Sequence, residues 1–136
     1  VCRGNWTTDE SVLLQGAYDK LGKFFDALDL DMLALEFSTP RAGEVEKLFS
    51  NNFLDTRVML GFGCVNPRSE VIETPEEIVS RVEELLQFLP PERIWLNPDC
   101  GFATFAKRPL NPYPIIQKKL ENMVAASKIL REKYCK

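Results

Sequence analysis

The chain has 136 residues, of which 45% are hydrophobic and 27% charged, and its net charge is −3 at pH 7. This length predicts one compact unit rather than two domains, and the composition is that of a globular protein without an apolar run long enough to cross a membrane. The acidic balance argues against a protein that binds nucleic acid by neutralising phosphates. His is absent, so any chemistry within these residues proceeds without imidazole.

The first half of the sequence predicts a helix, a strand and a second helix. Apolar residues at helical spacing over 9–28 predict an amphipathic helix, with Thr8 or Asp9 as its N-cap. Residues 32–37, MLALEF, form a short apolar run that ends in a Ser-Thr-Pro turn. Continuous apolarity of this kind is typical of a strand that is buried on both faces of a parallel sheet. A short helix is expected over 43–49.

The second half repeats this pattern. A second apolar run at 57–65 predicts another strand, and Thr-Pro-Glu-Glu at 74–77 begins a helix with an N-cap Thr, a first-turn Pro and a Glu three residues after the cap. The prolines at 90–91 are expected to end that helix. A third run at 93–97 is followed by a proline-rich loop and by a helix over 115–132. That last helix is expected to bury one side, formed by Ile116, Leu120, Met123, Val124, Ser127 and Leu130.

Alternating helices and strands predict parallel strands that are joined by right-handed crossovers. An open doubly wound sheet and part of a (β/α)8 barrel both fit this order, and three strands are too few for either architecture alone. Because the chain begins at Val1 rather than Met, we expect it to be a segment of a longer polypeptide. The apolar edges of its sheet would then need a cover.

Side chains with useful chemistry are expected at the carboxyl ends of the strands, where both architectures place their functional sites. Glu36 ends the first run, Cys64 and Asn66 end the second, and Cys100 follows the third. Cys2 precedes the first predicted helix, so it would end a strand that lies outside this chain. These residues are therefore expected to share one face.

The context of each residue separates candidate ligands from core residues. Burying Glu36 in its apolar run costs several kcal/mol unless a cation accompanies it, and a salt bridge to Arg41 is the alternative to a metal. Cys100 lies in an Asn-Pro-Asp-Cys-Gly loop, which favours a ligand or a nucleophile. Cys64 is expected in the core, and Cys135 is expected to take no part. Two thiols and a carboxylate on one face suggest zinc, which accepts sulfur, nitrogen and oxygen ligands.

Three segments resemble the C-terminal catalytic domain of cobalamin-independent methionine synthase. They are VCRGNW at 1–6, LEFSTPRAG at 35–43 and LNPDCGF at 96–102, and the most specific match is PPERIWLNPDCG at 90–101. The resemblance covers nearly the whole chain in the right order and spacing. It implies that residues 1–136 are one unit, the C-terminal part of a (β/α)8 barrel with about three β/α units and a preceding helix.

The resemblance also implies a zinc ion and its ligands. The family holds zinc with a His-x-Cys pair, a Glu, and the Cys of the Asn-Pro-Asp-Cys-Gly motif. Cys2, Glu36 and Cys100 match the last three of these ligands, and the His would precede Val1. The family transfers a methyl group from N5 of a methylated folate to the sulfur of homocysteine, and zinc keeps that sulfur as a thiolate. The resemblance thus implies a zinc-dependent homocysteine methyltransferase.

Two alternatives remain open. The family commonly places an acid–base His where this chain has Asn66, so another thiol acceptor, or a methyl donor such as a corrinoid, is the second hypothesis. The third is a non-catalytic fragment that self-associates through its exposed sheet edge. The fragment alone is expected to be inactive, because one ligand and most of the substrate site are missing. We expect a cytoplasmic protein with free thiols, and neither nucleic acid nor a membrane as its partner.

Overall fold

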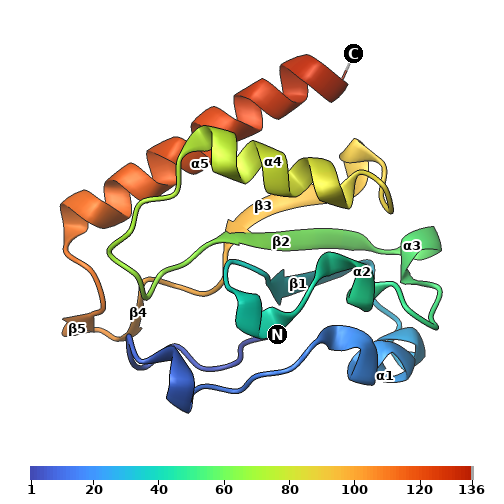
Figure 1. Ribbon diagram of the computed structural model, residues 1–136, viewed down its shortest axis with the longest axis horizontal. Coiled ribbons are helices and arrows are strands. Elements are labelled where there is room, and N and C mark those ends of the chain that lie inside the picture. The colour runs from blue at the N-terminus through green and yellow to red at the C-terminus, as the bar shows by residue number, and fades with distance from the viewer. Residues whose placement is uncertain (136) are drawn as a thin grey trace.

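A sheet of three parallel strands in the order β1-β2-β3 forms the centre of the computed structural model, which describes residues 1–135 (Figure 1). The strands span Met32–Glu36 for β1, Met59–Val65 for β2 and Ile94–Pro98 for β3. Both neighbouring pairs are parallel, with Leu33 opposite Leu60 and Leu60 opposite Ile94. The carboxyl ends of all three strands therefore lie at the same edge of the sheet.

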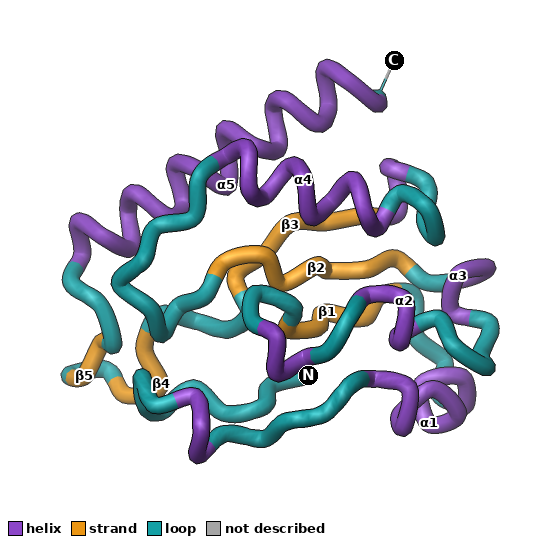
Figure 2. Tube along the Cα trace, in the orientation of Figure 1, coloured by secondary structure: helices purple, strands orange, loops and turns teal. Residues whose placement is uncertain are grey.

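Helices join the strands and cover the sheet (Figure 2). Two short helices, α2 at Val45–Leu48 and α3 at Leu54–Arg57, lie between β1 and β2. The helix α4 at Pro75–Leu85 leads from β2 to β3, and α5 at Tyr113–Tyr134 follows and packs against α4. The predicted start of α4 is confirmed, because the Thr74 and Glu77 side chains each accept a hydrogen bond from the other residue's backbone N–H.

The central strand β2 is buried at every position except its first. Leu60 and Phe62 have no exposed surface, and they pack among apolar side chains from β1 and from the helices. The pairing confirms that the three apolar runs are parallel strands. The burial expected of such runs holds for β2, whereas Ala34 in β1 and Trp95 in β3 are exposed. Burial of apolar surface is the main favourable contribution to folding, and each Å² that a strand such as β2 removes from water contributes about 25 cal/mol.

The predicted helix over 9–28 is wrong for most of its length. The segment contains two 3₁₀ turns, Glu10–Val12 and Tyr18–Leu21, and a true α-helix, α1, only at Gly22–Ala27. Between the turns Gly16 has a φ of 133°, which a helix does not accommodate. Its backbone N–H donates to a carbonyl outside the segment, so contacts with the rest of the chain override the helical spacing of the apolar residues.

The last helix is slightly longer than predicted, and its buried side differs. That side runs through Lys119, Met123, Ala126 and Leu130. Leu120 and Val124, which we expected in the core, are exposed at 37% and 51%. Apolar residues lie on both sides of α5, so spacing alone does not select the packed side.

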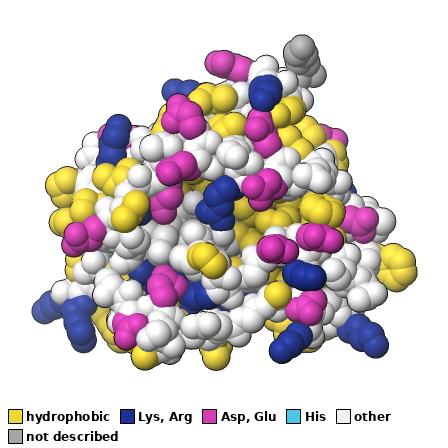
Figure 3. Space-filling view, viewed as in Figure 1, with side chains coloured by type: hydrophobic (Ala, Val, Ile, Leu, Met, Phe, Trp, Pro, Cys, Tyr) yellow, Lys and Arg dark blue, Asp and Glu magenta, His cyan; other side chains and the backbone are white. Residues whose placement is uncertain are grey.

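Smaller differences occur elsewhere. The proline-rich loop contains an antiparallel hairpin of β4, Ala103–Phe105, and β5, Arg108–Pro109. The helix α3 was not expected, and α4 ends at Leu85, before the prolines at 90–91. Among residues 1–135, no helix combines the length and the apolar character that a membrane crossing requires. On the face drawn in Figure 3, acidic and basic side chains are interspersed.

Candidate metal centre

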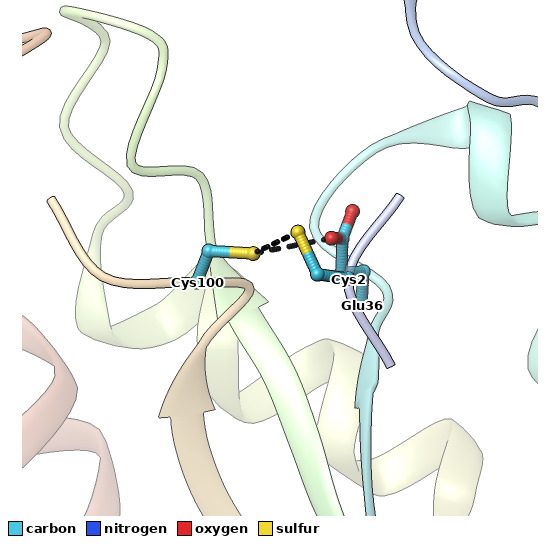
Figure 4. A group of neighbouring side chains, drawn as sticks. All are labelled: Cys2, Glu36 and Cys100. Atoms are coloured by element: carbon cyan, nitrogen blue, oxygen red, sulfur yellow. Dashed lines mark hydrogen bonds between the residues drawn. The ribbon is translucent and has the colours of Figure 1, made fainter. Parts of the chain in front are cut away.

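The three predicted ligands meet at the carboxyl ends of the strands (Figure 4). Glu36 is the last residue of β1, Cys100 lies two residues after β3, and Cys2 belongs to the segment before the first 3₁₀ turn. One ligand atom from each of the three lies within 4.8 Å of the other two. The Sγ of Cys100 is 3.2 Å from the Sγ of Cys2 and 3.2 Å from the Oε1 of Glu36. Residues up to 98 positions apart thus form one cluster.

The donor atoms of this cluster suit a divalent cation such as zinc. Burial and the neighbouring Cys2 and Glu36 raise the pKa of the Cys100 thiol, so this thiol keeps its proton and donates to Glu36. A cation among the three side chains would favour their anionic forms instead. Two thiolates and a carboxylate form a ligand set that zinc accepts, and further positions remain for another ligand and a substrate.

Glu36 is buried, with an exposure of 1%, and several groups bind it. The guanidinium of Arg41 donates to Oε2 at 2.6 Å, and the backbone N–H of Arg3 donates to Oε1 at 2.7 Å. The hydroxyl of Tyr18 binds the backbone of Glu36, donating to its carbonyl and accepting from its N–H. The sequence left a salt bridge to Arg41 and a metal as alternatives for Glu36, and the structure contains the salt bridge.

Asp99 holds the Cys100 loop against the end of β1. Its Oδ1 accepts the backbone N–H groups of Phe37 and Ser38 at 3.0 and 2.9 Å, and its Oδ2 accepts from Arg68 at 2.9 Å. The Ser38 hydroxyl also donates to this carboxylate. Burial raises the pKa of Asp99, while the bonds from Ser38 and Arg68 act in the opposite direction. Asp99 is thus a link between two strand ends.

A group of charges with two buried arginines lies beside the cluster and was not foreseen from the sequence. Glu10 bridges two arginines, with Oε2 2.8 Å from the Nε of Arg41 and Oε1 2.7 Å from the Nε of Arg68. The arginine side chains are only 5% and 0% exposed. The sequence contains one indication of these arginines. A Pro-Arg dipeptide follows shortly after each of two strands, at 40–41 after β1 and at 67–68 after β2.

The other singled-out residues lie outside the cluster. The side-chain N–H of Asn66 donates to Glu10 at 3.3 Å, and its carbonyl accepts the backbone N–H of Arg68 at 2.9 Å. Cys64 has no exposed surface, as expected for a core residue, and burial raises its pKa to about 12. Cys135 is an exposed thiol at the end of α5.

Comparison with known proteins gives consistent matches. The family model "Cobalamin-independent synthase, Catalytic domain" matches residues 8–129. The methionine synthase of Sulfurisphaera tokodaii is 37% identical over 117 residues, which are 86% of this chain and 31% of that protein. The 5-methyltetrahydropteroyltriglutamate–homocysteine methyltransferase of Candida albicans is 34% identical over 108 residues, 79% of this chain and 13% of that protein.

A solved structure has the same fold as this chain. It is a B12-independent methionine synthase from Shewanella sp. W3-18-1 in complex with selenomethionine, with a TM-score of 0.75 and 18% sequence identity. The match covers 98% of this chain and 38% of that one. This likeness and the parallel sheet confirm the predicted α/β fold class. The chain spans from 13% to 38% of the length of these three relatives.

Proposed function

Because the chain belongs to the family of cobalamin-independent methionine synthase catalytic domains, we propose that it supplies part of the active site of a zinc-dependent methyltransferase. The acceptor would be the thiol of homocysteine and the product methionine. The observation that carries this proposal is the cluster of Cys2, Glu36 and Cys100, whose ligand atoms lie within 4.8 Å of one another at the carboxyl ends of the strands.

In this proposal residues 1–136 are one unit, the C-terminal part of a (β/α)8 barrel. The parallel order β1-β2-β3 supports it, as does the family model that matches 8–129. Because β3 is the last strand in the order β1-β2-β3, its free edge would pair with another strand of the barrel. A cluster that needs reduced thiols also favours a reducing compartment such as the cytoplasm.

The residues of this chain would bind and orient the metal. Cys2, Glu36 and Cys100 would be ligands, and a zinc ion bound there supplies a Lewis acid that lowers the pKa of a substrate thiol. Arg41 and the backbone N–H of Arg3 hold the Glu36 carboxylate. The hydrogen bonds between the Asp99 carboxylate and the end of β1 keep the Cys100 loop in place. A fixed site of this kind holds a nucleophile in position for transfer.

We propose a methylated folate as the methyl donor. The Candida albicans relative, a 5-methyltetrahydropteroyltriglutamate–homocysteine methyltransferase that is 34% identical, supports that choice. Asn66 favours a second candidate, a corrinoid donor or another thiol acceptor with the same fold. The Asn66 side chain is already bonded to Glu10 and Arg68, and an amide does not serve as a general acid near pH 7.

Zinc content and methyl transfer test the proposal together. We would measure zinc per chain by plasma mass spectrometry, and methyl transfer to homocysteine in the complete polypeptide that carries this chain, with folate and corrinoid donors. We expect about one zinc ion per wild-type chain and a parallel loss of zinc and activity in Cys100→Ser and Glu36→Gln. Cys135→Ser is the matched control and should change neither.

The outcomes separate the hypotheses. Full zinc and activity in Cys100→Ser would contradict the ligand assignment. Zinc with activity only toward the corrinoid donor would favour the second candidate. A chain that binds no zinc and self-associates in light scattering would instead indicate a fragment that assembles through its exposed sheet edge.

A further inference from the structure

The two carboxylate oxygens of Glu36 have different partners. Oε1 faces the cluster, where it accepts from the backbone N–H of Arg3 at 2.7 Å and from the Cys100 thiol at 3.2 Å. Oε2 faces away from the thiols and accepts from the Nη2 of Arg41 at 2.6 Å. Both side chains of this pair are buried, with exposures of 1% for Glu36 and 5% for Arg41. Charge-assisted hydrogen bonds of this kind are about twice as strong as neutral ones.

Each nitrogen of the Arg41 guanidinium group has a partner. Its Nε pairs with Glu10 at 2.8 Å, and its Nη1 donates to the carbonyls of Arg3 and Leu14, each at 3.3 Å. Glu10 in turn pairs with the Nε of the fully buried Arg68 at 2.7 Å. Arg41 therefore cannot turn away from Glu36 without breaking several bonds at once.

We propose that Arg41 is a positioning residue that withholds Oε2 of Glu36, so that this carboxylate offers only Oε1 to a cation in the cluster, and that Glu10 fixes Arg41 in this role. The inference rests on the proposed metal centre. Carboxylates bind metals through one or two oxygens. A second oxygen from Glu36 would take the coordination position that a catalytic zinc site keeps open for substrate.

Cobalt(II) is a suitable probe because its visible absorption is stronger in four-coordinate sites than in five- or six-coordinate ones. We would add one equivalent of Co²⁺ to the complete polypeptide that carries this chain, and record the spectra of the wild type, Arg41→Met and Glu10→Gln. The matched control is Arg57→Met, because Arg57 also donates to several carbonyls, those of Phe25, Asp26 and Leu28, at the opposite end of the sheet.

In Arg41→Met we expect the visible band to weaken about twofold, as the freed Oε2 raises the coordination number. Glu10→Gln should shift the spectrum in the same direction, and Arg57→Met should match the wild type. An unchanged spectrum in Arg41→Met, or an equal change in Arg57→Met, would overturn the proposal. If Arg41→Met does not fold, Arg41→Lys replaces it, because Lys keeps the charge but lacks the fork that reaches several acceptors.

A second measurement needs no metal. The N–H of Arg3 donates to Glu36 Oε1, so its hydrogen exchange reports whether the carboxylate is held in place. We expect about tenfold faster exchange at Arg3 in Arg41→Met and no change in Arg57→Met. A wild-type chain that binds no cobalt would overturn the metal centre, and faster exchange would still support the orienting role of Arg41. Unchanged exchange at Arg3 in Arg41→Met would overturn that role even if cobalt binds.

Discussion

The Oδ1 of Asp99 accepts a hydrogen bond from the backbone N–H of Ser38 at 2.9 Å, and this bond joins the end of β3 to the end of β1 across 61 residues. The approach depends on Gly63 in β2, where a Cβ atom would lie only 2.6 Å from the Oδ1 of Asp99. Glu36 and Cys100 are close neighbours of the bonded residues in sequence. The bond therefore fixes the relative positions of two of the three candidate ligands.

Replacing Asp99 with Asn should lower both stability and zinc affinity. The buried guanidinium of Arg68 would lose one of its two carboxylate partners, and the backbone N–H groups of Phe37 and Ser38 at the end of β1 would lose a charged acceptor. We expect the free energy of unfolding to fall by about 2–4 kcal/mol in urea titrations. Asp29→Asn makes the same chemical change at an exposed position and should stay within about 0.5 kcal/mol of the wild type. Equal stability of the two variants would contradict this role of Asp99.

Lys119→Met should destabilise the chain although it makes α5 more apolar. The ammonium of Lys119 is fully buried, pairs with Glu73 at 2.9 Å and donates to the carbonyl of Val71. Glu73 also accepts the backbone N–H of Asn66, so the variant leaves a largely buried carboxylate without its cation. We expect a loss of about 2–4 kcal/mol in the free energy of unfolding.

The adjacent Lys118 provides the control for that prediction. Its side chain is 54% exposed and pairs with Glu121 at 3.6 Å on the surface of α5. Lys118→Met should change the free energy of unfolding by about 0–1 kcal/mol. If Lys119→Met is as stable as Lys118→Met, the buried pair of Lys119 and Glu73 makes no net contribution to the free energy of unfolding.

The sequence predicts the strands and the site edge well, because these features have local signals. Strands buried on both faces are continuous apolar runs, and the first polar side chains after them, such as Glu36 and Cys100, lie at one edge by the geometry of a parallel sheet. The start of α4 was also predictable, because the hydrogen bonds between Thr74 and Glu77 lie within a single turn of the chain. The ends of the first and third apolar runs therefore predicted Glu36 and Cys100, the carboxylate and one thiol of the cluster.

Features that depend on tertiary partners were not predictable from the sequence. Lys119 looks like a solvated residue until Glu73, 46 positions away, is placed beside it. Arg68 is buried only because Glu10 and Asp99 both reach it. The segment 9–28 has apolar residues at helical spacing, yet its backbone bonds to other parts of the chain. Buried charges and contacts between distant segments leave no periodic pattern in the sequence, so the sequence alone does not predict them.

Zinc should protect Cys2 and Cys100 from alkylation and leave Cys135 reactive. Without metal, the exposed thiols of Cys2 and Cys135 should react readily with iodoacetamide, whereas the buried Cys64 should not. A thiolate that binds a metal is a poor nucleophile toward such a reagent, so added zinc should slow labelling only in the cluster. Peptide mapping by mass spectrometry measures each site. Equal protection of Cys135, or none of Cys2, would contradict the assigned ligands.

Stability should fall above about pH 8.5, and part of this loss should come from Cys64. Burial raises the pKa of its thiol to about 12 in the folded chain, whereas a thiol in an unfolded chain has a pKa of about 8.5. Between these values the folded state keeps a proton that the unfolded state loses. The free energy of unfolding therefore falls with pH, by up to about 1.4 kcal/mol per pH unit.

The variant Cys64→Val separates this contribution from those of other titrating groups, because it keeps an apolar side chain of similar volume and removes the thiol. We expect the stability of the wild type relative to Cys64→Val to decrease by about 2 kcal/mol between about pH 8 and pH 10. Cys135→Ala, which removes an exposed thiol, should run parallel to the wild type over the same range. A constant difference between the wild type and Cys64→Val would mean that the Cys64 thiol titrates alike in both states, and that water reaches it in the folded chain.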